Sequence, residues 1–154
     1  MEQRRLGNTG LTVSALGYGA GNVGGLMVRG THEEQVATVK RALDAGITYF
    51  DTAPLYGSGL SEQHLGAVLT ELDAWGRVRV GTKVRLTTDD LRDPAAAVEK
   101  SITESLRRLG RDSIDLLQLH NTIRATIDAA SLGLGPDDLA AAASSRSASW
   151  PVAR

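Results

Sequence analysis

Several kinds of residue and segment are absent from this chain of 154 residues. It contains no cysteine, which excludes disulfides, cysteine nucleophiles and thiolate metal sites. It has no run of about 18 apolar residues, so no segment is expected to cross a membrane. The formal net charge is only -1, which indicates no basic surface for nucleic acid. The first residues lead into no apolar run, so we expect no signal peptide and predict a cytoplasmic protein.

Short runs of β-branched and aromatic residues alternate with longer amphipathic stretches up to residue 121. Three residues of helix-capping type, Thr31, Ser61 and Asp93, precede the amphipathic stretches and predict where helices begin. Glu34 follows Thr31 at the spacing of a capping box, and Pro94 follows Asp93 at the first helical position. The strands are predicted at residues 13–16, 47–50, 78–83 and 114–119.

This alternation predicts an α/β fold with parallel strands joined by right-handed crossovers. Turn residues at 6–11 predict a small β-hairpin or a tight turn ahead of the first parallel strand. Two architectures fit the alternation, an open doubly wound sheet and a (β/α) barrel. The periodicity fades beyond residue 121. We therefore predict a structured part at residues 1–121 and a divergent, low-complexity, partly disordered tail at residues 122–154.

A glycine-rich segment follows the first predicted strand. Residues 19–24 fit the spacing G-x-G-x-x-G, which in a Rossmann fold places a pyrophosphate at a helix N-terminus and Asp51 on a ribose. The match is weak, because further loop residues separate the motif from the helix predicted after Thr31. Two other interpretations remain: a flexible loop over a strand end, or a backbone that approaches a ligand closely.

Four polar residues lie at, or just after, the carboxyl ends of predicted strands. Asp51 and Tyr56 follow the second strand, Lys83 ends the third, and His120 follows the fourth. In parallel βα folds these strand ends converge on one face, where ligands bind. Each residue could instead have its own structural role, such as a loop cap, a packed ring or a solvated charge. Four different polar types at neighbouring strand ends favour a single site.

These residue types suit acid–base chemistry on a carbonyl group. An isolated tyrosine titrates near pH ~10 and is a poor proton donor. A lysine ammonium beside it favours the phenolate and lowers the pKa of the phenol, and a carboxylate keeps the lysine charged and oriented. A histidine can hydrogen-bond the carbonyl oxygen. Such a site would protonate a carbonyl oxygen as hydride arrives from a nicotinamide.

At these residues the chain resembles the aldo-keto reductase family, in its bacterial branch with short loops. The resemblance implies a (β/α)8 barrel, plugged at its bottom by an N-terminal hairpin, that reduces aldehydes and ketones with NADPH or less often NADH. The motifs that carry it are residues 5–14 (Arg-Leu-Gly-Asn-Thr-Gly-Leu-Thr-Val-Ser), 50–57 (Phe-Asp-Thr-Ala-Pro-Leu-Tyr-Gly), 61–62 (Ser-Glu), 65–66 (Leu-Gly), 81–83 (Gly-Thr-Lys) and 115–120 (Asp-Leu-Leu-Gln-Leu-His).

The resemblance also implies roles for individual residues. Tyr56 would be the proton donor, Lys83 and Asp51 would tune it, and His120 would orient the substrate carbonyl. The substrate would be a small carbonyl compound or a sugar-like one, the cofactor NADP with NAD as the alternative, and no metal is implied. The residues implied beside the cofactor are Gly19, Ala20, Gly21, Asp51 and Asn121.

A barrel of this type needs about 250 residues or more. We therefore expect a partial barrel of about four βα units, and suspect a truncated or frameshifted reading frame. The strand residues expected to face the interior without an opposing layer are Ile47, Phe50, Val80 and Leu117. Open strand edges then predict self-association. An active reductase and an inactive fragment or binding module both remain open, with a Rossmann-type domain as a weaker alternative.

Overall fold

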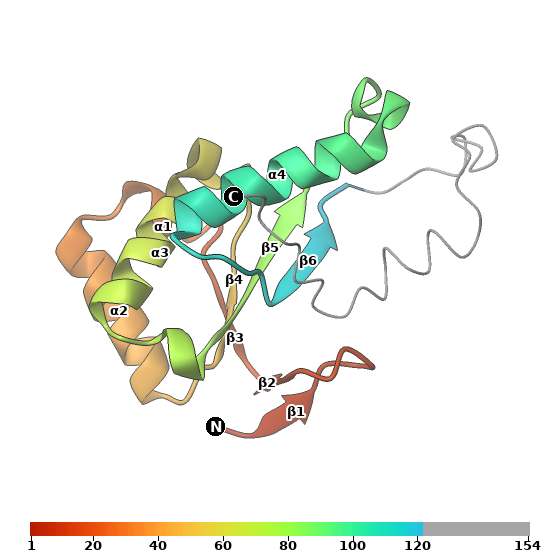
Figure 1. Ribbon diagram of the computed structural model, residues 1–154. Helices are drawn as coiled ribbons and strands as arrows, with labels where there is room; N and C mark the ends of the chain where they lie inside the picture. The colour runs from red at the N-terminus through yellow and green to blue at the C-terminus, as the bar shows by residue number, and fades with distance from the viewer. Residues whose placement is uncertain (122–154) are drawn as a thin grey trace.

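The computed structural model describes residues 1–121, so the predicted tail at 122–154 lies outside the described residues (Figure 1). Its centre is a parallel sheet whose four strands are hydrogen-bonded in the order β3-β4-β5-β6. The strands are β3 (Gly17–Gly19), β4 (Tyr49–Asp51), β5 (Arg79–Val84) and β6 (Leu116–Leu119). The order follows the chain without the reversal of a doubly wound sheet, so the Rossmann interpretation is wrong and the barrel arrangement is confirmed.

The helices lie together on one side of this sheet (Figure 1). The helix α3 follows β4 along the chain and packs between α2 and α4. Among the described residues, no helix combines the length and the apolar character that crossing a bilayer requires. The helices are α1 (Leu26–Arg29), α2 (His32–Asp44), α3 (Leu60–Glu71) and α4 (Pro94–Leu109), with 3-10 turns η1 (Tyr56–Gly59), η2 (Trp75–Arg77) and η3 (Asp90–Arg92).

The predicted N-terminal hairpin is confirmed. Its strands β1 (Gln3–Arg5) and β2 (Thr12–Ser14) pair antiparallel. The backbone N–H of Ser14 donates to Oγ1 of Thr48 at 2.8 Å, and the backbone N–H of Thr48 donates to Oγ of Ser14 at 2.9 Å. Because Thr48 directly precedes β4, these bonds hold the hairpin at the amino ends of the parallel strands.

The first parallel strand does not lie where it was predicted. Residues 12–14 belong to the hairpin, and β3 lies instead within the glycine-rich segment, at Gly17–Gly19. A Cβ added at Gly17 would lie 2.9 Å from Cδ1 of Tyr49 on the neighbouring strand. Glycine is needed at this position because the Tyr49 ring packs against it. The strand was not predicted here because strand propensity disfavours glycine.

Two of the three predicted helix starts are confirmed. Thr31 and Glu34 form a full capping box, in which the Glu34 N–H donates to the Thr31 hydroxyl and the Thr31 N–H donates to the Glu34 carboxylate. Asp93 accepts a hydrogen bond from the backbone N–H of Ala96 at 3.1 Å, with Pro94 as the first helical residue. These caps satisfy N–H groups that the first helical turn leaves without partners.

Ser61 was predicted to cap α3, and this is wrong. The helix begins at Leu60 after Gly59, whose φ of 95° lies in the left-handed region that favours glycine. Ser61 lies inside the first turn and is fully buried. Its hydroxyl donates to the carbonyl oxygen of Ala20 at 2.8 Å instead of capping its own helix.

The hydrophobic core lies between the sheet and the helices. Phe50 and Val80 are 0% and 3% exposed and belong to this core, so the expectation that they face the barrel interior is wrong. Ile47 packs against the same cluster, and Leu117 pairs in register with Thr82, which also faces the helices. The helices bury the apolar face of each strand, and this leaves the opposite face to polar side chains. The core residues include Val39, Leu65, Val68, Leu69 and Leu109.

Candidate active site

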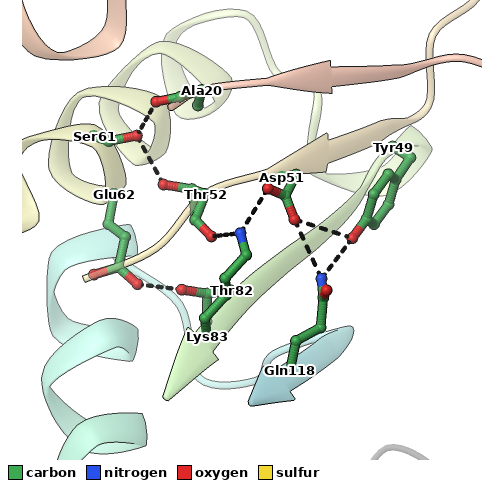
Figure 2. Close-up of polar contacts among 9 residues, drawn as sticks. All are labelled: Ala20, Tyr49, Asp51, Thr52, Ser61, Glu62, Thr82, Lys83 and Gln118. Atoms are coloured by element: carbon green, nitrogen blue, oxygen red, sulfur yellow. Dashed lines mark hydrogen bonds and ion pairs between the residues drawn. The ribbon is translucent and has the colours of Figure 1, made fainter. Parts of the chain in front are cut away.

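An ion pair between Lys83 and Asp51 lies at the carboxyl ends of β4 and β5 (Figure 2). The Nζ of Lys83 is 2.6 Å from Oδ2 of Asp51 and 2.8 Å from the carbonyl oxygen of Thr52, to which it also donates. The side chain of Lys83 is only 11% exposed, whereas that of Asp51 is 29% exposed. Because water screens the ammonium poorly here, the carboxylate and the carbonyl fix its position.

Tyr56 and His120 complete the cluster that the sequence predicted. The Nζ of Lys83 lies 4.8 Å from the centroid of the Tyr56 ring, a cation–π distance. The rings of Tyr56 and His120 are perpendicular, with their centroids 5.6 Å apart. The structure therefore brings all four predicted side chains together, although they come from β4, η1, β5 and the residue after β6.

The surroundings of His120 favour its neutral imidazole form. Burial lowers its pKa, and the positive charge of Lys83 lowers it further, with a smaller contribution from Arg85. The carboxylate of Asp51 acts in the opposite direction but does not reverse the shift. The Nδ1 of His120 is buried and has no hydrogen-bond partner within residues 1–121. An imidazole nitrogen without a partner can donate or accept a further hydrogen bond, depending on the tautomer.

The predicted cofactor residues at the end of β3 lie beside this cluster. A Cβ added at Gly21 would lie 3.6 Å from the ring of Tyr56, and one added at Gly19 would meet nothing within 4 Å. Ala20 is buried, and its backbone N–H donates to the carbonyl oxygen of Asp51 at 2.8 Å. The chain therefore passes close to Tyr56 with only small residues, and open space remains over Gly19.

Asn121 has a different environment. Its Oδ1 accepts from the backbone N–H of Leu86, and its Nδ2 donates to the carbonyl oxygen of the same residue, both at 3.1 Å. The amide therefore extends the pairing of β5 and β6 beyond the last strand residues. These bonds tie Asn121 to the loop after β5, and among residues 1–121 its side-chain hydrogen bonds go to Leu86 and not to Tyr56.

Two residues of the site were missed, Tyr49 and Gln118. The Nε2 of Gln118 donates to the hydroxyl of Tyr49 at 3.0 Å and to Oδ1 of Asp51 at 3.2 Å. Burial and the nearby carboxylate of Asp51 raise the pKa of Tyr49 to about 12. The alternation of strand side chains could have identified them, because each lies two residues before a predicted site residue, Asp51 or His120, on the same face.

Two residues in the first turn of α3 form hydrogen bonds with residues at the ends of three strands. The Ser61 hydroxyl lies 2.8 Å from Oγ1 of Thr52, after β4, and also bonds the carbonyl of Ala20, after β3. The neighbouring Glu62 accepts a hydrogen bond from Thr82 of β5 at 2.5 Å (Figure 2). Asp51 and Lys83 are the direct neighbours of Thr52 and Thr82. The consecutive Ser-Glu pair therefore restrains the backbone that carries the ion pair.

Comparison with known proteins places the chain in a family. Residues 15–135 match the sequence model of the Aldo/keto reductase family. L-galactose dehydrogenase from Arabidopsis thaliana is 41% identical over 129 residues, covering 83% of this chain and 40% of that protein. D-threo-aldose 1-dehydrogenase from a Pseudomonas species is 41% identical over 145 residues, covering 79% of this chain and 44% of that protein. The chain thus spans about two fifths of the length of these curated relatives.

Solved structures agree with this assignment. The holo form of an aldo-keto reductase from Bacillus halodurans superposes with a TM-score of 0.67 at 30% identity, covering 86% of this chain and 44% of that one. An aldo-keto reductase from Klebsiella pneumoniae in complex with NADPH superposes with a TM-score of 0.60 at 25% identity, covering 86% and 43%. The chain is therefore a member of the aldo/keto reductase family, and its fold is part of a (β/α)8 barrel.

Proposed function

We propose that this chain carries the proton-donating part of an NADP(H)-dependent oxidoreductase site, with Tyr56 as the proton donor. The substrate is an aldehyde or a ketone, or the corresponding alcohol in the reverse direction. The observation that carries this proposal is the convergence of Asp51, Tyr56, Lys83 and His120 at the carboxyl ends of the strands. These four side chains supply a phenol, a nearby positive charge, a carboxylate that holds this charge, and a neutral imidazole.

Each side chain has a role in the proposed proton transfer. When the Tyr56 hydroxyl gives its proton to a carbonyl oxygen, negative charge develops on the phenol. The ammonium of Lys83, 4.8 Å from the ring centroid, stabilises this charge, and Asp51 keeps the ammonium in place. The lowered pKa of His120 favours the neutral ring, which can donate a hydrogen bond to the same carbonyl oxygen without competing as an acid.

The cofactor proposed for this site is NADP(H), with NAD(H) as the alternative. When bound, it supplies the hydride that reduces the carbonyl carbon. The residues present fit a flat ring near Tyr56, because open space remains over Gly19 and Gly21 lets the backbone pass close to the Tyr56 ring. Relatives solved with NADPH, and with NADP and acetate, support this choice. The residues that would line the cofactor are Gly19, Ala20, Gly21, Asp51 and Asn121.

The proposed substrate is a small hydroxylated carbonyl compound, or the sugar-like alcohol related to it. Two relatives are an L-galactose dehydrogenase and a D-threo-aldose 1-dehydrogenase, and a structural neighbour is a glycerol dehydrogenase. All three names describe polyhydroxylated substrates.

We also propose a cytoplasmic location, where nicotinamide cofactors are available.

A second proposal is that the chain alone is inactive and associates through its sheet edges. Among the described residues, no strand pairs with the outer edge of β3 or β6, and Leu119 on β6 is 43% exposed. Open strand edges are templates for pairing with another chain. Size-exclusion chromatography then shows assemblies larger than one chain.

One experiment separates the two proposals. The purified chain is titrated with NADPH in a thermal-shift assay and then incubated with an aldose or a small aldehyde while NADPH absorbance is followed. If the chain is a reductase, NADPH stabilises the wild type and Tyr56→Phe alike. The variant then loses carbonyl reduction by about 10²–10⁴-fold, the contribution of a general acid. No thermal shift and no NADPH consumption at millimolar cofactor would favour the inactive fragment.

A further inference from the structure

Both carboxylate oxygens of Asp51 are occupied by different partners (Figure 2). The Oδ2 accepts from Lys83 at 2.6 Å, and Oδ1 accepts from Gln118 at 3.2 Å. The hydroxyl of Tyr49 also lies 3.5 Å from Oδ1. Lys83 and Gln118 are register partners on β5 and β6, so the two donors reach Asp51 from adjacent strands.

The sheet provides space for this arrangement at two glycines. A Cβ added at Gly81 would lie 3.1 Å from Cζ of Tyr49 and 3.2 Å from Nε2 of Gln118. A Cβ added at Gly17 would lie 2.9 Å from the same tyrosine ring. Gly17 is the register partner of Tyr49 on β3, and Gly81 is the register partner of Asp51 on β5. Since glycine weakens a strand, its presence at both positions beside the Tyr49 ring indicates that the ring and the amide require this space.

The polarity of the three groups determines their orientation. A carboxylate only accepts hydrogen bonds, so the NH2 of Gln118 faces Asp51. The second N–H of the same amide donates to the Tyr49 hydroxyl at 3.0 Å. The pKa of Tyr49 is raised to about 12, so this hydroxyl keeps its hydrogen at neutral pH and can direct it toward Asp51. The three side chains therefore satisfy one another and hold the carboxylate in one rotamer.

We propose that Gln118 is a positioning residue for the proton-donating site. By holding Oδ1 of Asp51, the amide keeps Oδ2 turned toward Lys83 and thereby keeps the ammonium over the ring of Tyr56. The catalytic consequence rests on the proposed function, in which Tyr56 donates a proton and the charge of Lys83 assists this transfer. The positioning itself is a property of the folded chain and can be measured without cofactor or turnover.

The test uses the three tyrosines of the chain as NMR probes. The full chain is produced with ¹³C-labelled tyrosine, and the Tyr56 signal is assigned with Tyr56→Phe. Gln118→Met removes the donor while keeping the length of the side chain, and we expect it to shift the Tyr56 ring resonance. The signal of Tyr18 stays unchanged, because its ring packs on Phe50 at 5.3 Å, within the core that faces the helices.

A matched control and a double-mutant cycle exclude a space-filling role. Gln63 is exposed on α3, and Gln63→Met leaves the Tyr56 signal in place. If Gln118 acts through Asp51, then Gln118→Met adds no further shift of the Tyr56 signal in an Asp51→Asn background. The same additional shift in both backgrounds would overturn the proposal, and so would an unchanged Tyr56 signal in Gln118→Met.

A second variant keeps the test decisive if Gln118→Met does not fold. Gln118→Glu preserves the shape of the side chain but places a second carboxylate beside Oδ1 of Asp51, and the two repel each other. We expect a larger shift of the Tyr56 resonance than in the methionine variant, again without change at Tyr18. A Tyr56 signal at the wild-type position in this variant would contradict the proposal, whether or not the chain oxidises NADPH.

Discussion

The carboxylate of Glu62 on α3 lies 2.6 Å from the guanidinium Nε of Arg108 on α4, and Glu62 is fully buried. The other carboxylate oxygen accepts from the Thr82 hydroxyl. Ser105 accepts a hydrogen bond from the same guanidinium at 3.3 Å. A buried carboxylate is tolerated only when partners of this kind compensate its lost hydration. The pair therefore joins two helices to the strand that carries Lys83.

Replacing Arg108 by methionine leaves this buried carboxylate without its counter-charge. We expect the free energy of unfolding to fall by about 3–5 kcal/mol, measured by chemical denaturation. Arg107 on the same helix is exposed, and Arg107→Met changes stability by less than about 0.5 kcal/mol. A double variant, Glu62→Leu with Arg108→Met, loses less than Arg108→Met alone because no charge remains buried. Equal losses in the Arg108 and Arg107 variants would contradict this account.

A side chain at Gly66 is expected to separate α3 from α4. A Cβ there would contact the backbone carbonyl oxygen of Leu109 and lie 2.8 Å from its carbonyl carbon. We expect Gly66→Ala to reduce the free energy of unfolding by about 1–3 kcal/mol, because backbone cannot move aside as a flexible side chain can. The control is Gly76→Ala, where an added Cβ meets nothing within 4 Å and no loss is expected. Thermal melts of the two variants, measured side by side, compare their losses of stability, and equal losses would contradict this account.

The pKa of His120 reports the charge of Lys83. Burial is the main cause of its lowered pKa, and the ammonium of Lys83 is the next. Lys83→Met removes a positive charge near the ring and frees the Asp51 carboxylate, and both effects favour the imidazolium. We therefore expect the pKa of His120 to rise, measured by NMR titration of the three histidines. Lys40→Met, at an exposed position on α2, serves as the control and leaves the pKa of His120 unchanged.

Ionisation of the Tyr49 phenol is expected to lower the free energy of unfolding at alkaline pH. Its pKa is raised to about 12 in the folded chain, above the value of about 10 expected when unfolded. The folded state therefore binds the proton more tightly, so the stabilisation is complete below about pH 10 and is lost as the pH rises toward about 12. Tyr49→Phe has no such group, and its free energy of unfolding falls less between about pH 9 and about pH 11. An identical decrease in wild type and variant would show that the phenol ionises equally in both states.

Two kinds of feature could be predicted from the sequence: helix caps, which depend on neighbours within one turn, and polar residues at strand ends, which a parallel βα fold brings to one face. Thr31 and Asp93 cap their helices, because a cap needs only its own side chain and N–H groups two or three residues away. The convergence of the four predicted polar residues was also expected, since strand ends in a parallel βα fold meet on one face whatever the details of the packing. Asp51 and Lys83 lie 32 residues apart in sequence, yet form the central ion pair.

The features that were missed or misplaced depend on contacts between distant segments. β3 contains glycine where the Tyr49 ring packs, and Gln118 reaches Tyr49 from 69 residues away. Ser61 looks like a cap, but its hydroxyl bonds a strand end 41 residues earlier. The choice of which strand face is buried follows from the helices that cover it. Local residue order specifies helix ends and candidate chemistry, whereas close packing across the sheet selects the partners, because contact free energies depend on neighbours that only the folded chain brings together.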